Sequence, residues 1–95
     1  MTSKRLTKKY KTIFLEELKA LRSHSGLSQR ELEAKIGLAQ DLISRSEAGS
    51  RRVDVFELAL WAQACGSTLE AFVRRFDERI VANKEPSLLR PTTEE

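Results

Sequence analysis

The chain has 95 residues, of which 33% are charged and 40% hydrophobic, and its formal net charge is +3. This length allows one small domain with a single core, and the composition is ordinary for a soluble globular protein. No apolar stretch approaches the ~20 residues needed to cross a bilayer, and no secretory signal follows the basic N-terminus. The single cysteine, Cys65, excludes an internal disulfide, so we expect a cytoplasmic protein that does not bind membranes.

The positive charge is concentrated at the N-terminus. Residues 1–11 contain no acid and five basic residues: Lys4, Arg5, Lys8, Lys9 and Lys11. Their charge of +5, set against the total of +3, leaves −2 for the remainder of the chain. The segment is either a solvated tail or a basic arm that attracts polyanions. Because the remainder is not basic, charge alone gives only weak support for nucleic-acid binding.

The first predicted helix begins near Tyr10 and ends before Gly26, a residue suited to the left-handed end of a helix. The sequence determines its start only to within several residues, because no strong capping residue precedes Thr12. Apolar residues at helical spacing indicate the buried face: Ile13, Phe14, Leu18 and Leu21.

The clearest helix start in the sequence lies at Ser28. Ser28 and Glu31 have the S-x-x-E spacing of a capping box, in which the two side chains satisfy two free amides. We therefore predict a second helix from Gln29 to Ile36, ended by Gly37. A third predicted helix covers about residues 39–48 and is ended by Gly49.

The fourth predicted helix starts at Asp54, where Glu57 repeats the capping device. One apolar face is expected from five of its residues: Val55, Leu58, Trp61, Ala62 and Cys65. A fifth helix, capped by Ser67 or Thr68, is expected to reach about Ala82. Its apolar residues recur at i, i+3, i+4, i+7 and i+11, a strong amphipathic pattern: Leu69, Phe72, Val73, Phe76 and Ile80.

These elements predict an all-α fold with three parts. Residues 1–11 form a basic N-terminal arm, residues 12–83 a helical domain, and residues 84–95 a tail. The tail is polar and contains Pro86 and Pro91, so we predict that it is disordered. No alternating apolar pattern or hairpin turn indicates a strand.

The second and third predicted helices, joined through Gly37 and Leu38, have the sequence shape of a helix-turn-helix. The motifs around them are GLSQREL at 26–32, IG at 36–37 and ISRSEAGSRR at 43–52. Together with residues 54–72, they resemble the xenobiotic-response-element (XRE) class of lambda-repressor-like domains over about residues 13–76. The resemblance implies a compact five-helix domain that binds double-stranded DNA.

The resemblance also implies roles for individual residues. Those expected to contact bases are Gln40, Asp41 and Arg45. Those expected to contact phosphates are Gln29, Ser50, Arg51 and Arg52. Arg22 and Glu47 match a pair that joins the first helix to the third by a salt bridge. The chemistry agrees with these roles, because Gln pairs bidentately with adenine, Arg pairs with guanine, and basic loop residues neutralise phosphates.

Each role has a plainer alternative. Asp41 and Arg45 are four residues apart and can pair across the helix surface. The two loop arginines can be solvated or pair with Asp54, and Gln29 can bond to Gln40. Cys65 and Trp61 are expected in the core.

Three residues depart from the family pattern. Glu33 brings a charge to a tightly packed position and must reach solvent or a partner. Ser46 stands where an apolar residue is usual. Ala39 stands where Ser or Thr often caps the third helix, and a missing cap costs ~1 kcal/mol.

No nucleophile–base pair or phosphate loop is visible, and one Cys with one His cannot make a metal site. We therefore expect no enzyme activity and no cofactor. The sequence favours a repressor-like regulator acting as a homodimer on an inverted repeat, with an interface from four apolar residues: Phe56, Leu60, Phe76 and Ile80. Two alternatives remain open. The first is an antitoxin or restriction–modification controller with the same fold, and an antitoxin would also bind a partner protein. The second is a protein-interaction adaptor that has lost DNA binding.

Overall fold

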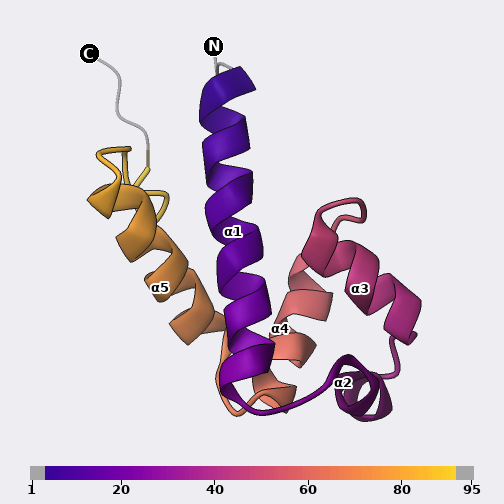
Figure 1. Cartoon of the computed structure of the whole chain (residues 1–95). Helices are drawn as coiled ribbons and strands as arrows, with labels where there is room; N and C mark the ends of the chain where they lie inside the picture. Colours follow the sequence, from indigo (N-terminus) through magenta and orange to yellow (C-terminus); the bar gives the residue numbers. More distant parts are fainter. Residues whose placement is uncertain (1–3, 92–95) are drawn as a thin grey trace.

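The computed structural model describes the backbone of residues 4–91 and the side chains of residues 8–91. Within this range the chain is all-helical (Figure 1), so the predicted fold class is confirmed. The five helices are α1 (Lys4–His24), α2 (Gln29–Ile36), α3 (Gln40–Ala48), α4 (Val55–Ala64) and α5 (Leu69–Ala82). α2 and α3 lie on one side of α1, and α5 runs along its other side (Figure 1). None of the described helices is long and apolar enough to span a membrane.

Local capping explains where α2, α4 and α5 begin. The Ser28 hydroxyl accepts from the Glu31 amide at 3.0 Å, and the Glu31 carboxylate accepts from the Ser28 amide at 2.8 Å. Asp54 and Glu57 form the same reciprocal pair at the start of α4. Thr68, the second of the two predicted residues, caps α5. These starts follow the sequence signals because each uses only residues within one helical turn.

α1 is longer than predicted, since it begins at Lys4 and not near Tyr10. The predicted arm of residues 1–11 therefore lies largely within a helix, and its residues 1–3 lie outside the described range. Lysine has a good helix propensity, which allows a helix without a capping residue. A tertiary contact adds support, because Lys9 Nζ lies 3.3 Å from Oε2 of Glu85, which follows α5.

Aromatic packing joins α1 to α5. The ring of Phe14 meets those of Phe72 and Phe76 edge-on, with centroids 5.6 and 5.9 Å apart. Ile80, on the same face of α5, is fully buried. The prediction that Ile80 belongs to a dimer interface is therefore wrong, because this residue is fully buried within one copy. Phe76, the other α5 residue predicted for the interface, is half-buried and packs against the core. The prediction that Val55 faces the core is also wrong, since 70% of this residue is exposed at the first turn of α4.

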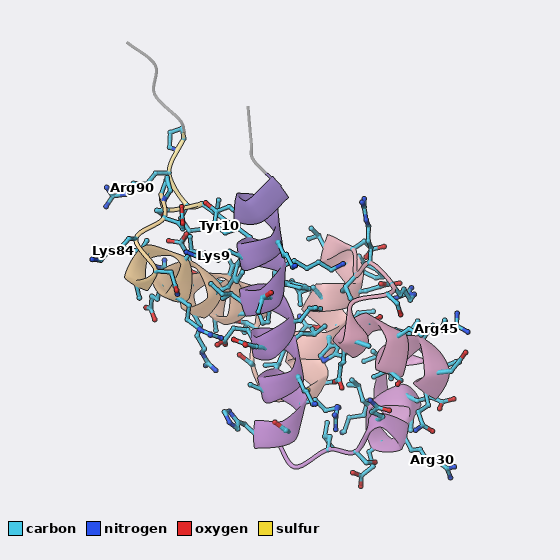
Figure 2. All side chains as sticks on the ribbon, turned by 45° about the horizontal axis from the view of Figure 1, so that its top comes forward. Lys9, Tyr10, Arg30, Arg45, Lys84 and Arg90 are labelled. Carbon is cyan, nitrogen blue, oxygen red and sulfur yellow. The ribbon has the colours of Figure 1, made fainter. Side chains whose placement is uncertain are left out.

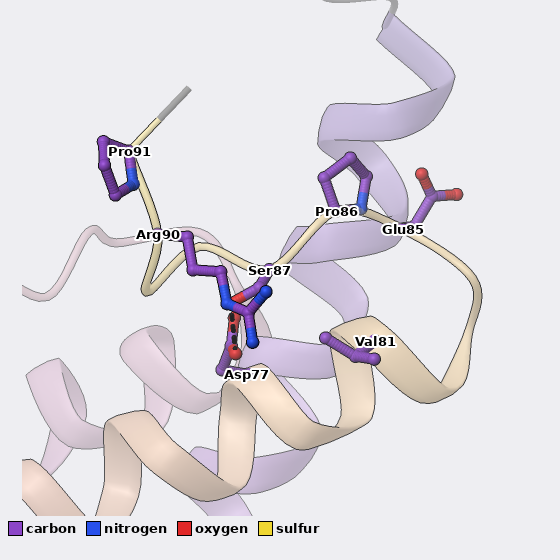
Figure 3. A pocket seen from close by; sticks show the side chains of 7 residues that line it. All are labelled: Asp77, Val81, Glu85, Pro86, Ser87, Arg90 and Pro91. Atoms are coloured by element: carbon purple, nitrogen blue, oxygen red, sulfur yellow. Dashed lines mark hydrogen bonds between the residues drawn. The ribbon is translucent and has the colours of Figure 1, made fainter. Parts of the chain in front are cut away.

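The segment after α5 is attached to the domain and does not form the disordered tail expected from residue 84. The buried carboxylate of Asp77 accepts from the Ser87 hydroxyl at 2.7 Å (Figure 3). It also accepts from the Leu88 amide at 2.5 Å. A hollow of about 590 Å³ remains beside this contact, lined partly by Arg90 and Pro91. Residues 92–95 of the predicted tail lie outside the described range.

Candidate nucleic-acid interface

An ion pair between α1 and α3 orients the second helix of the helix-turn-helix. Arg22 Nε and Nη2 donate to the two carboxylate oxygens of Glu47 at 2.7 and 2.9 Å. The side chains are only 14% and 5% exposed. Hydrogen bonding to Glu47 raises the pKa of the Arg22 guanidinium, which also donates to the Leu27 carbonyl at 2.9 Å. α3 is thus fixed through its inner face, at the pair that the family resemblance implies.

A chain of side-chain hydrogen bonds leads from this ion pair to the surface. Gln29 Nε2 donates to Glu47 at 3.1 Å, and Gln40 Nε2 donates to Gln29 at 3.4 Å. Arg30 Nε then donates to Gln40 Oε1 at 3.2 Å. Gln29 therefore makes the bond to Gln40 that the sequence left as an alternative. The half-buried Gln40 side chain is held by two partners before any ligand arrives.

Arg30 is a surface residue that sequence reasoning missed. It is exposed and projects from the same end of the molecule as Arg45 (Figure 2). The only sequence signal for it is its place directly after Gln29, in the first turn of α2. Arg30 therefore lies beside the Gln40 side chain at the surface, and its guanidinium carries further N–H groups that can donate to an anion.

Glu33 supplies the helix cap that Ala39 lacks. Ala39, at the N-cap of α3, makes no side-chain cap, but Glu33 Oε1 of α2 accepts from the Gln40 amide at 3.1 Å. A carboxylate at a helix N-terminus is favoured both by the free amides and by the helix dipole. Two of the departures from the family pattern therefore compensate each other.

The outer face of α3 carries Asp41 and Arg45, whose side chains are 68% and 63% exposed. Arg45 Nη2 lies 3.8 Å from Asp41 Oδ2, so the surface pairing left open by the sequence is present. Such an exposed pair is worth only ~0.3–0.5 kcal/mol. Arg45 can therefore leave Asp41 for a base edge at small cost.

The two arginines of the α3–α4 loop have different surroundings. Arg51 forms a bidentate pair with Glu57, at 2.7 and 3.1 Å, and donates to the buried Ser46 hydroxyl at 3.1 Å. Its partner is Glu57, and not Asp54, which the sequence left as an alternative. Arg52 is exposed and forms no salt bridge within residues 8–91. Arg51 therefore attaches the loop to α4, whereas the exposed charge of Arg52 is not engaged by a described carboxylate.

The sequence profile of a helix-turn-helix domain family matches residues 13–76, about two thirds of the chain. This chain belongs to that helix-turn-helix family. The matched range includes all of α2, α3 and α4, and it has the bounds over which the sequence resembles the XRE class. No curated protein and no solved structure matches the chain.

In a helix-turn-helix protein the second helix of the motif enters the major groove, and its first residues contact base edges. α3 is the second helix of the motif in this helix-turn-helix protein. Gln40 lies in its first turn, and Arg45 lies about 7.5 Å further along the axis, at 1.5 Å per residue.

Proposed function

We propose that this helix-turn-helix protein is a sequence-specific, repressor-like transcriptional regulator that binds an inverted-repeat operator as a homodimer. The observation that supports this most directly is the two-sided arrangement of α3. Its inner face is fixed by the pair of Arg22 and Glu47. Its outer face presents polar side chains with major-groove chemistry: Gln40, Asp41 and Arg45.

Arg45 and Gln40 are assigned to different bases of one half-site. Their separation of about 7.5 Å corresponds to about two base-pair steps of 3.4 Å. Arg45 should prefer guanine and Gln40 adenine, because each side chain makes two hydrogen bonds there. Asp41 can accept from cytosine or orient Arg45. Arg52 and the exposed Ser50 are assigned to phosphates beside this half-site, and Gln29 to a phosphate at the start of α2.

The test is a binding series on an operator selected from random DNA and on a scrambled duplex. Arg45→Ala should lose ~1–3 kcal/mol on the operator and relax the preference at one base position. Arg52→Ala should weaken both duplexes alike and flatten the salt dependence. If Arg45→Ala weakens both duplexes equally, Arg45 is a backbone contact and the assignment of the reading residues is wrong.

The homodimer is proposed to form through the start of α4. Val55 and Phe56 are 70% and 71% exposed, and Leu60 follows Phe56 by one turn and is half-buried. Two copies joined there would present two α3 helices to successive major grooves, about 34 Å apart. Sedimentation at high micromolar concentration should show a dimer that Phe56→Ser dissociates, while Val81→Ser on α5, which is also exposed, does not. A monomeric wild type would contradict this dimer.

A protein-interaction adaptor is the second candidate, and the ion pair between Asp41 and Arg45 favours it. An acid beside the reading arginine repels phosphates and weakens any contact with DNA. Retention on random DNA at low salt separates the two functions. A regulator is retained through its phosphate contacts, whereas an adaptor passes through.

A further inference from the structure

The helical start of α1 gives its lysines fixed directions, which a flexible arm would not. Successive residues of a helix are rotated by about 100°, so Lys9 and Lys11 lie about 200° apart, on opposite sides of α1. Lys8 and Lys11 are three residues apart and lie on the same side. The basic N-terminal segment is therefore divided between two edges of one helix.

The edge of α1 that carries Lys9 already has a contact within the domain. Lys9 Nζ contacts Glu85 Oε2 at 3.3 Å, and the neighbouring Tyr10 is half-buried. Both residues lie toward the segment that follows α5 (Figure 2). The charge of Lys9 is thus compensated within the domain.

The opposite edge of α1, which carries Lys8 and Lys11, lies against the end of α3, the proposed recognition helix. A Cβ atom added at Gly49 would lie 3.4 Å from Lys11 Cε and 2.7 Å from Leu15 Cδ1. The aliphatic part of Lys11 therefore packs on the turn that ends α3. Lys11, Arg51 and Arg52 line one hollow of about 420 Å³ between α1 and the loop.

The charges on this edge lack compensation. Arg51 is paired with Glu57, but Lys8, Lys11 and Arg52 form no salt bridge with any residue whose side chain the structure describes. All three are exposed. α1 continues beyond the loop, away from α2 (Figure 1). The row formed by Lys8, Lys11 and Arg52 therefore begins at the end of α3. It extends along α1 to residues that precede the matched family domain, which starts at residue 13.

We propose that Lys8, Lys11 and Arg52 form a phosphate-binding edge that contacts the DNA backbone flanking the half-site read by α3. This rests on the proposed function, because it assumes that α3 lies in the major groove. Duplex DNA is the ligand because its backbone offers a dense line of negative charge to exposed cations that lie along one helix edge and the adjoining loop. The edge adds affinity that depends on salt and on the length of the duplex, but not on the flanking sequence.

The test is the salt dependence of operator binding by three single variants: Lys8→Gln, Lys11→Gln and Lys9→Gln. Glutamine keeps a similar helix propensity, and melting curves verify that each variant is folded. Lys8→Gln and Lys11→Gln should each lower the slope of log K against log salt by about 0.9. Lys9→Gln, on the same helix but the opposite edge, should leave the slope unchanged. Equal slopes for Lys11→Gln and wild type, or equal losses for Lys9→Gln and Lys11→Gln, would overturn the proposal.

Duplex length gives an independent measurement. Removing the base pairs outside the half-sites should weaken wild type more than the Lys8→Gln/Lys11→Gln double variant. If wild type binds the operator and Arg45→Ala loses base preference, but the lysine variants behave like wild type on both duplexes, only the edge is refuted. If wild type binds no duplex at low salt, the proposed function fails and the edge fails with it.

Discussion

α2 and α4, the helices on either side of α3, begin differently from α3 itself. α2 and α4 are each capped by a reciprocal pair of their own residues, Ser28 with Glu31 and Asp54 with Glu57. α3 has no side-chain cap of its own, and the Gln40 amide is satisfied by Glu33 from the preceding helix. The flanking helices can thus form with local support, whereas α3 depends on its neighbours.

The same contrast holds along the rest of α3. Its last turn is attached to α1 through Glu47, and the loop that follows is attached to α4 through Arg51 and Glu57. Three neighbouring helices therefore determine the direction of α3. If α3 enters a major groove as proposed, its side chains must be presented at a fixed angle, and these contacts would then affect DNA recognition as well as stability.

The largest expected effect is at the attachment of α3 to α1. Glu47→Ala leaves the Arg22 charge partly buried without a partner, and should lower the free energy of unfolding by about 2–4 kcal/mol. Glu70→Ala removes an exposed pair with Arg74 and should cost at most ~0.5 kcal/mol. Thermal or denaturant unfolding measures both. A loss for Glu47→Ala no larger than that of the control would show that the pair does not anchor α3.

Removing the cap that Glu33 of α2 provides for α3 should have the next largest effect on stability. Glu33→Ala should lower the free energy of unfolding by about 1.5 kcal/mol, because the lost acceptor is charged. It should also reduce the base preference of the operator complex, since the first turn of α3 carries Gln40. Adding Ala39→Ser to this variant supplies a local cap and should restore both properties. Failure of Ala39→Ser to restore either would mean that Glu33 acts in some way other than as a cap.

The local cap of α2 provides the matched comparison. Ser28→Ala should cost about 1 kcal/mol in unfolding free energy. It should leave the base preference at the operator unchanged, because the cap determines the start of α2 and not the direction of α3. If Ser28→Ala changed the base preference as much as Glu33→Ala, a cap within one helix would not differ in effect from a cap supplied by a neighbouring helix.

The smallest effect concerns the pH dependence of the loop attachment. Hydrogen bonding to Arg51 lowers the pKa of Glu57, with a further contribution from the Asp54 amide. A carboxylate with a lowered pKa stabilises the fold above its unfolded pKa of about 4.3, and this stability is lost as pH falls through the folded value. The Glu57→Gln variant should therefore show a shallower loss of stability below about pH 4.3. Parallel acid curves for the variant and wild type would show that Arg51 and Glu57 are not coupled.

Much of the candidate site follows from local sequence. The ends of α2 and α3 were predictable because Gly37 and Gly49 adopt the left-handed conformation that the sequence indicates. Arg22 and Glu47 were found only through the family resemblance, since 25 residues separate them. Arg30 and Glu33 were not assigned to the site, because each acts through Gln40 of another helix. Lys11 was assigned only to the basic arm, because its packing on the turn after α3 is a tertiary contact.

What the sequence by itself determined is therefore the set of helices, the caps of α2, α4 and α5, and the helix-turn-helix motif formed by α2 and α3. These depend on residues within one or two turns of each other, whose spacing is fixed by the helix. Only the tertiary structure decided the start of α1, the burial of Ile80, the exposure of Val55 and the division of the N-terminal lysines between two edges. A helix of apolar or basic residues does not specify which side a neighbour will cover, because that depends on how separate helices pack together.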